Sequence, residues 1–479
     1  MTSLTRRSFL KRSALTTAAA FSAPARFWSQ VPGANQDIRV AVVGFNSRGG
    51  SHISAFSDMK GVRLAALCDC DSRVLAGAAK RATDRGQQLE TYTDVRKLLE
   101  DKSIDVISTA TPNHWHSLIT VWSCQAGKDV YVEKPVSHNI FEGRKSVEAA
   151  RKYNRIVQTG TQNRSSTALK QAFAWVKEGH LGKIKIARGL CYKPRGSIGK
   201  VKHAQSIPSN IDYDLWCGPA LKLPLMREKL HYDWHWVWNT GCGDIGNQGI
   251  HEMDKSRWAL GKTALAPKVF SIGGRLGYVD DGETANTQMA VFDYGDALLV
   301  FEVRGLPSSS ASGSMDKYRG ESVGQVIECE GGYLAGTVAY DNDKQVIKKF
   351  TGKSAELGHF ANFIEAVRSR KREDLHADIL EGHTSSALCH MANISYRLGQ
   401  QASPDELHAA LKKDAAAAET LARMEQHLAA NGVDLNRSKL SIGPTLEFDP
   451  KAERFTSSEK ANELVSRPYR APFIVPEKV

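Results

Sequence analysis

A glycine-rich turn near the start of the chain carries residues suited to holding a phosphate. Gly44-Phe45-Asn46-Ser47-Arg48-Gly49 follows an apolar run and opens a helical pattern. Gly44 permits a tight turn, Gly49 permits close packing of helix on strand, and the free N–H groups at a helix start attract a pyrophosphate. Asn46 replaces the middle glycine of the dinucleotide fingerprint. We assign this turn to a cofactor site, with the following members: Gly44, Asn46, Ser47, Arg48 and Gly49.

An acidic residue ends the second predicted strand. Asp69 lies 25 residues after Gly44, where a carboxylate accepts hydrogen bonds from the adenosine ribose and repels a 2′-phosphate. A degenerate glycine motif alone also fits a simple turn, but this arrangement favours a nucleotide. It predicts NAD rather than NADP, and Arg73 is the residue that would reverse that preference.

Two more polar stretches follow predicted strands. They are Thr111-Pro112-Asn113-His114-Trp115-His116 and Glu133-Lys134-Pro135. A lone histidine or lysine is usually a surface residue. Open α/β sheets, however, bind ligands at the carboxyl ends of their strands, so this placement favours a functional site. The residues that we add to the cofactor site are Thr111, Pro112, Asn113, His116 and Glu133.

The pattern of the chain predicts the elements that position these residues. Short apolar strands at 38–43, 62–68, 104–109, 129–133 and 156–159 alternate with helical stretches such as 115–126 and 141–153. This rhythm predicts a doubly wound parallel sheet of the Rossmann type. Longer strands with alternating polarity follow at 183–192, 268–275, 286–294, 297–304 and 323–330. They predict a second domain built on an open, mainly antiparallel sheet.

We divide the chain into four parts on this basis. Residues 1–25 form an export signal, 36–158 the nucleotide-binding domain, 159–400 a substrate and oligomerisation domain, and 401–479 a helix with an extended tail. Thr5-Arg6-Arg7-Ser8-Phe9-Leu10-Lys11 matches the twin-arginine motif, and Ala23-Pro24-Ala25 is a small-x-small cleavage site. A basic N-terminus without a signal is the alternative. We expect the twin-arginine translocase to carry the folded protein to the periplasm.

Composition narrows the range of partners. No apolar run approaches the ~20 residues that cross a bilayer, which predicts no stable membrane insertion. The net charge of +12 is scattered and accompanies no reading motif, which argues against a nucleic-acid partner. Eight cysteines without a CxxC pair predict mostly free, buried thiols.

Together these motifs resemble the Gfo/Idh/MocA (glucose–fructose oxidoreductase/inositol dehydrogenase) family, over about residues 38–398. The resemblance implies an NAD(P)-dependent oxidoreductase that acts on a sugar or polyol, commonly as a homo-oligomer. It also implies that Lys134 contacts substrate and nicotinamide, that Glu133 lines the cofactor pocket, and that Pro135 follows a cis bond.

A second signature, residues 241–254, carries another catalytic candidate. The resembled family has an aspartate and, four residues later, a histidine on one helical face as an acid/base pair. Here His251 is retained and Asn247 replaces the aspartate. An amide can orient a substrate hydroxyl but cannot hold a negative charge or act in proton transfer. Asn247 is therefore assigned to substrate contact, and Asp244, one turn upstream, is the candidate substitute for the missing acid. We assign catalysis to Lys134 and His251, with a structural histidine as the alternative for His251.

Other residues are candidates for contact with substrate. Trp234 and His235 lie in an aromatic stretch, 231–238, that suits the faces of a sugar ring, although core packing explains the tryptophans equally well. Arg164, Lys193 and Arg195 follow strand-like segments and would meet a hydroxylated or acidic ligand, or remain solvated. The histidines at 231, 235 and 251 lack a carboxylate at matched spacing, so we predict no metal.

Two rival functions stay open at this point. A redox-neutral glycosidase or lyase would oxidise a sugar transiently, and Asn247 together with the expected export favours it. A non-catalytic sugar- or nucleotide-binding protein is the second rival, against which Lys134 and His251 argue. Because free NAD should be scarce outside the cytoplasmic membrane, we expect the nucleotide to be tightly bound. The tail, or the segment after the cleavage site, would act as its clamp.

Overall fold

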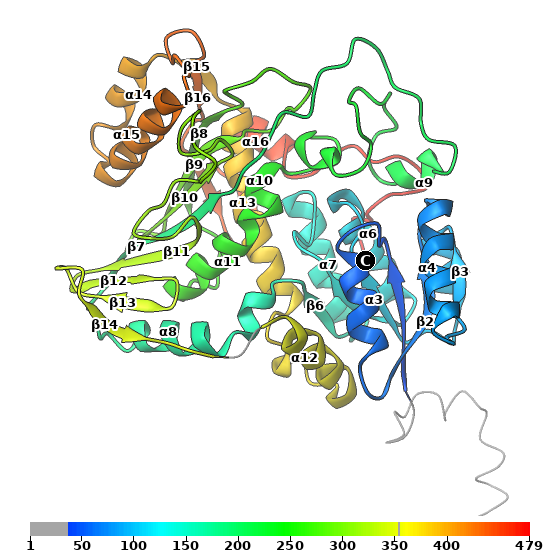
Figure 1. Ribbon diagram of the computed structural model, residues 1–479. Coiled ribbons are helices and arrows are strands. Elements are labelled where there is room, and N and C mark those ends of the chain that lie inside the picture. Colours follow the sequence, from blue (N-terminus) through cyan, green and yellow to red (C-terminus); the bar gives the residue numbers. More distant parts are fainter. Residues whose placement is uncertain (1–36, 353–354) are drawn as a thin grey trace, which may run out of the picture.

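Two sheets organise the protein in a computed structural model that describes residues 37–352 and 355–479 (Figure 1). The predicted export signal lies outside the described residues. The first sheet has six parallel strands in the order β3-β2-β1-β4-β5-β6. The strands are β1 Ile38–Val43, β2 Val62–Cys68, β3 Glu90–Tyr92, β4 Val106–Thr109, β5 Asp129–Val132 and β6 Val157–Thr159. This order confirms the predicted Rossmann-type sheet.

Helices connect the parallel strands and cover the sheet. They are α3 Gly49–Ser57, α4 Ser72–Asp84, α5 Val95–Glu100, α6 Asn113–Gln125 and α7 Ile140–Lys152. The strands are short apolar runs because both faces are covered, and Val40, Ala41 and Val42 of β1 are fully buried. The strand order reverses between β1 and β4, which opens a crevice at the carboxyl ends of these two strands.

The second domain is built on a larger sheet with β7 Ile184–Tyr192 near its centre. The strand order is β14-β13-β12-β11-β7-β10-β9-β8-β16-β15, and β17 pairs with β8 and with β18. Among the described strands of this sheet, only β7 and β10 pair in parallel. The other strands are β8 Lys268–Gly274, β9 Thr287–Asp293, β10 Leu298–Arg304, β11 Val323–Cys329, β12 Gly332–Ala335, β13 Val338–Tyr340, β14 Val346–Lys349, β15 Gln400–Ala402, β16 Leu440–Ile442, β17 Leu446–Asp449 and β18 Arg454–Phe455. The predicted mainly antiparallel domain is confirmed.

Helices pack on both faces of this sheet. Alternate residues of β9 belong to different clusters: Ala290 and Phe292 pack with α13, whereas Met289 and Val291 pack with α14 and α15. Successive side chains of a strand point to opposite faces, so the two groups of helices lie on opposite sides. The helices that follow the first sheet along the chain are α8 Thr167–Lys177, α9 Tyr213–Cys217, α10 Gly243–Asn247, α11 Gly249–Leu260, α12 Glu356–Ser369, α13 Ile379–Arg397, α14 Pro404–Leu411, α15 Ala415–Ala430 and α16 Glu459–Glu463, with 3-10 turns at Gln162–Ser165, Asp233–Trp236 and Arg372–Asp374. Of these, α12 returns to the first domain, where Phe360 and Phe363 share a core with Val40 of β1.

The C-terminal segment, predicted as a helix with an extended tail, takes part in both domains. Its strands β16 and β17 join the large sheet beside β8. After α16 the chain, red in Figure 1, passes α9 and returns to the first domain, where Phe473 and Val475 are buried near Trp115. All eight cysteines are free and seven are buried, as predicted. Within the described ranges no helix is long and apolar enough to cross a membrane.

Candidate functional site

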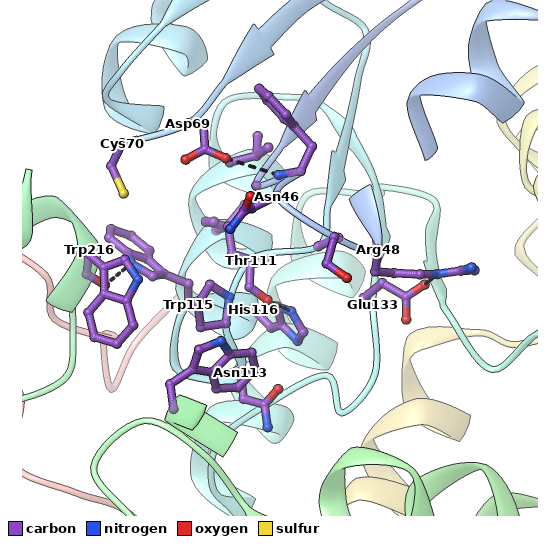
Figure 2. Close-up of a pocket in the computed structure, with 18 of the residues that line it drawn as sticks. Asn46, Arg48, Asp69, Cys70, Thr111, Asn113, Trp115, His116, Glu133 and Trp216 are labelled. Carbon is purple, nitrogen blue, oxygen red and sulfur yellow. Dashed lines mark hydrogen bonds and ion pairs between the residues drawn. The ribbon is translucent and has the colours of Figure 1, made fainter. Parts of the chain in front are cut away.

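A cavity of about 410 Å³ lies at the carboxyl ends of the first-domain strands (Figure 2). Nearly every residue that the sequence assigned to the cofactor lines it. These residues are Gly44, Asn46, Ser47, Arg48, Asp69, Thr111, Pro112, Asn113, His116 and Glu133. Gly49 does not line the cavity, because it supports the turn from within α3.

The glycine turn is fixed by space and by backbone angle. Gly44 has φ +74°, and a Cβ there would lie 2.7 Å from the Thr111 Cγ2 atom. A Cβ on Gly49 would lie 2.1 Å from the Gly44 carbonyl oxygen. Neither position accepts a side chain unless neighbouring atoms move. With glycine at both positions the turn stays tight, and its backbone can form part of the cavity wall. A cradle of this kind fits the close approach of a pyrophosphate.

Two polar side chains suit the rest of a dinucleotide. The Asp69 carboxylate accepts hydrogen bonds from the backbone N–H groups of Phe45 at 3.1 Å and Asp71 at 2.9 Å. Burial raises the pKa of Asp69, although these two bonds oppose the shift. The buried Nδ2 atom of Asn113 has no hydrogen-bond partner within the described part of the chain. A ribose hydroxyl for Asp69 and an acceptor for Asn113 would satisfy both groups, so the residues present fit the cofactor.

Glu133 is the centre of a buried hydrogen-bond network. Its Oε1 atom accepts bonds from Arg48 Nε at 2.8 Å, His52 Nε2 at 3.1 Å and Gln162 Nε2 at 3.1 Å. Burial by itself would raise the pKa of Glu133, but the bond from His52 and the charge of Arg48 hold it well below its usual range. Glycine at position 160 makes space for the Glu133 side chain, since a Cβ at Gly160 would lie 2.7 Å from the Glu133 carboxylate. Glu133 therefore stays ionised and organises the site.

Lys134 extends from the same strand end into the cavity. Its Nζ atom donates a hydrogen bond to the Asn247 carbonyl oxygen at 2.8 Å. Burial lowers the pKa of Lys134, partly offset by the charge of Glu133. The Lys134–Pro135 bond is cis, as the resemblance implied. The ring nitrogens of His116 contact the carbonyl oxygens of Pro135 at 2.6 Å and Thr111 at 2.7 Å, which joins the two strand-end loops.

Of the residues assigned to the substrate, Trp234, His235 and Asn247 line the cavity. The rings of Trp234 and His235 are stacked with centroids 3.6 Å apart. Burial lowers the pKa of His235 to about 3, so the imidazole is neutral at ordinary pH.

The remaining charged candidates do not line the cavity. Asp244 and Arg195 form a buried ion pair with Nη2 and Oδ1 2.8 Å apart, and Asp244 lies 3.5 Å from the Asn247 amide. Arg164 is buried against Asp254 at 2.8 Å, and Lys193 donates to the Gln248 side chain at 2.8 Å. Burying a charge is costly unless it is paired. Each of these charged side chains therefore bonds to a residue from elsewhere in the chain and is not available to the ligand.

His251 also lies outside the cavity lining but keeps an unused atom. Its Nδ1 atom is buried and has no hydrogen-bond partner among the residues that the structure describes. Burial lowers the pKa of His251 to about 3, and the charge of Lys134 adds to the shift. The imidazole is therefore neutral and available for a hydrogen bond. Over the described ranges, no group of three His, Cys, Asp or Glu side chains is placed to hold a metal ion.

The sequence reasoning missed one wall of the cavity. Residues 207–238, which we call the strap, contribute Leu215, Trp216, His231 and Tyr232 in addition to the two predicted aromatic residues. Trp115, noted only as part of a motif, also lines the cavity. The strap has little regular structure, and only its density of tryptophan and histidine signalled a site.

Two family models match the chain. One, described as an oxidoreductase family with an NAD-binding Rossmann fold, matches residues 38–161. The other, the C-terminal alpha/beta domain of the same GFO_IDH_MocA oxidoreductases, matches residues 167–300. Together they cover more than half of the chain. The protein belongs to the Gfo/Idh/MocA family. Its first domain is an NAD-binding Rossmann fold, as predicted.

Curated relatives of this family member match it over part of their length. A glycosyl hydrolase family 109 protein of Shewanella sp. (strain ANA-3) is 31% identical over 163 residues, which are 30% of this chain and 36% of that one. The inositol 2-dehydrogenase of Salmonella typhimurium is 25% identical over 181 residues, 37% of this chain and 52% of its own. The chain thus spans between about a third and about half of these relatives.

Solved structures share the fold at low sequence identity. The WlbA dehydrogenase from Bordetella pertussis, in complex with NADH and UDP-GlcNAcA, has a TM-score of 0.56 and 20% identity, covering 74% of this chain and 94% of that one. A levoglucosan dehydrogenase in complex with NADH and levoglucosan has a TM-score of 0.56 and 17% identity, covering 74% and 95%.

Proposed function

We propose that this protein is an NAD-dependent oxidoreductase that transfers a hydride between nicotinamide and a hydroxyl-bearing carbon of a sugar, glycoside or polyol. The observation that carries the proposal is the position of Lys134, which reaches the cavity from a strand end between the Glu133 network and Asn247. The inositol 2-dehydrogenase and the structures with NADH and a sugar ligand support the substrate class.

The residues of this chain would orient the substrate and handle its proton. The bound cofactor supplies the hydride chemistry. Lys134 takes the proton of the reacting hydroxyl, because burial has already weakened its hold on its own proton. The Asn247 carbonyl fixes the direction of the amine, whereas His251 lies outside the cavity lining and no contact with the substrate is assigned to it. Trp234 and His235 offer an aromatic face to the sugar ring.

A second candidate is a redox-neutral glycosidase, which the family 109 relatives favour at 31% identity. In that reaction the sugar would be oxidised, lose its aglycone by elimination, add water across the resulting double bond and be reduced again, with no net change in the cofactor. Lys134 would serve the same proton transfer. The amide of Asn247, where related dehydrogenases carry an acid, is compatible with this use.

One experiment separates these functions. Purified protein with NAD is offered a panel of sugars, polyols and chromogenic glycosides, while NADH absorbance and aglycone release are followed together. Accumulation of NADH with at least one substrate supports the dehydrogenase. Aglycone release without NADH supports the glycosidase. Calorimetric binding of NAD and a sugar with neither product would support a binding protein instead.

We further propose export by the twin-arginine route with the nucleotide already bound. The sequence Thr5–Lys11 and the expected need to retain a scarce cofactor support it. Replacing Arg6 and Arg7 by lysine should keep the protein in the cytoplasm, as cell fractionation would measure. Equal periplasmic amounts of both forms, or cytoplasmic location of the wild type, would contradict the proposal.

A further inference from the structure

The strap forms part of the cavity wall together with the strand-end loops. Leu215, Trp216 and His231 line it together with Asp69, and Trp234 and His235 line it together with Lys134. Figure 2 shows Trp216 beside Trp115, whose indole N–H donates to the Trp216 carbonyl oxygen at 3.2 Å. A dinucleotide that extends from Asp69 to Lys134 would therefore lie between the strap and the Rossmann sheet.

The strap is tied to the first domain by both backbone and side-chain hydrogen bonds. The Ser72 N–H donates to the Asn210 carbonyl at 2.9 Å, and the Asp212 N–H donates to the Cys70 carbonyl at 3.1 Å. These bonds lie directly after β2, next to Asp69. The Trp115 indole N–H also donates to the Leu215 carbonyl at 3.0 Å. The strap therefore closes over the end of the cavity where Asp69 lies.

The C-terminal tail holds the outer side of the strap. The Arg470 guanidinium donates to the Asp214 carboxylate at 2.8 Å, to the Asp214 carbonyl at 2.8 Å and to the Gly218 carbonyl at 3.0 Å. Arg467 donates to the Asn239 carbonyl at 2.9 Å. Arg470 thus binds the strap, and Arg467 binds Asn239, the residue directly after the strap.

The same tail is anchored in the first domain. Phe473 is 1% exposed and packs edge-to-face on Trp115 with ring centroids 5.4 Å apart. The Tyr469 hydroxyl donates to the Glu142 carboxylate at 3.2 Å. The tail therefore connects the strap to the helices α6 and α7, and the strap cannot move away from the cavity without breaking the Arg470 bonds.

We propose that residues 466–475 are a latch that holds the strap over the bound nucleotide and sets the rate at which the nucleotide leaves. The proposal rests on the NAD site of the proposed function. Slow dissociation needs only contacts that must break before the ligand departs. No residue of the latch itself lines the cavity, and the latch meets the lining only through the packing of Phe473 on Trp115, away from Lys134, so it acts on release without taking part in the chemistry.

The test measures nucleotide exchange and needs no substrate. Protein loaded with isotope-labelled NAD is mixed with excess unlabelled NAD, and the label that stays bound is counted over time. In the Arg470→Ala variant the label should leave about tenfold faster, because hydrogen bonds of a charged group are lost. Arg454→Ala is the matched control, since Arg454 lies in the same tail but pairs with exposed Glu459.

A second variant approaches the same contact from the strap. Asp214 is 46% exposed at its side chain, so Asp214→Asn is expected to fold. It removes the charge from one of the four oxygen atoms that accept from Arg470, so it should speed exchange by a smaller factor. The double variant Arg470→Ala/Asp214→Asn should exchange no faster than Arg470→Ala alone, because both changes break one contact.

The outcomes separate the latch from the NAD site. Faster exchange in both single variants, with Arg454→Ala unchanged, supports the latch. Equal exchange rates in wild type, Arg470→Ala and Asp214→Asn overturn it while the NAD site stands. A wild type that takes up no NAD at all overturns both proposals.

Discussion

The two walls of the cavity are built in different ways. The strand-end wall consists of residues that directly follow β1, β2, β4 and β5, so the register of one parallel sheet places Gly44, Asp69, Thr111 and Lys134 together. The strap wall has almost no regular structure and is held by side chains that bind backbone carbonyls, such as Trp115 and Arg470.

This difference separates chemistry from access. The strand-end wall carries the groups that hold charge and a proton, and its positions tolerate little movement. The strap carries aromatic surface and depends on a tail that arrives from the other end of the chain. Changes in the first wall should therefore alter turnover or nucleotide choice, whereas changes in the second should alter exchange.

Lys134→Ala should lower turnover by roughly 10²–10⁴, the usual worth of a positioned proton-transfer group. NAD binding should persist, because Asp69 and the glycine turn remain. Turnover with the substrate found in the sugar panel and calorimetry with NAD measure the two effects. The exposed surface change Lys97→Ala serves as control. Near-normal turnover of Lys134→Ala would show that Lys134 does not transfer the proton.

Asp69→Asn should weaken NAD binding by about ten- to hundredfold, the worth of hydrogen bonds to a charged acceptor. Loss of the negative charge should also narrow the preference for NAD over NADP. Titration of both nucleotides into wild type, Asp69→Asn and the exposed control Asp84→Asn gives the comparison. If the wild type already prefers NADP, Asp69 does not determine nucleotide choice and Arg73 becomes the candidate determinant.

Gly49→Ala should weaken NAD binding by about tenfold, because a Cβ placed 2.1 Å from the Gly44 carbonyl must displace the turn. Gly50→Ala is a matched control in the same helix, since nothing lies within 4 Å of a Cβ there. It should leave affinity unchanged and add about 0.5–1 kcal/mol of stability. If both variants bind NAD like the wild type, the glycine turn is not part of the nucleotide site.

The last prediction concerns stability and a residue that supports the strand-end wall. His390 of α13 is buried, contacts the Ser137 carbonyl at 3.1 Å, and has its pKa lowered by burial to about 3. Because the unfolded value is about 6.5, the neutral ring contributes its full stability above pH 6.5 and loses it as pH falls towards 3. The loss amounts to about 2 kcal/mol between pH 6.5 and pH 5.

His390→Gln keeps a donor for Ser137 but has no proton to gain. Its free energy of unfolding should therefore decline less between pH 6.5 and pH 5 than that of the wild type, as denaturant unfolding at both pH values would measure. Exposed His180→Gln is the control and should follow the wild type. Identical pH dependence in all three proteins would show that His390 does not titrate as argued.

The sequence by itself determined the fold class and the strand-end wall. A strand followed by a turn residue fixes where that residue points, because parallel strands end at a common edge. Gly44, Asp69 and Lys134 each follow an apolar run that only a buried strand explains. Their assignment therefore needed local pattern and nothing from distant parts of the chain.

Only the tertiary structure decided which charges face the ligand and what closes the cavity. Arg164, Arg195 and Asp244 read as site residues, yet folding pairs Arg195 with Asp244 and Arg164 with Asp254. A sequence shows a charge but not its partner. Arg470 is separated from Asp214 by 256 positions, and neither residue lies in a periodic pattern. Contacts between irregular segments leave no local signal. The sequence predicted only that the tail, or the segment after the cleavage site, would clamp the nucleotide, and the contacts between the tail and the strap became visible only when the chain was folded.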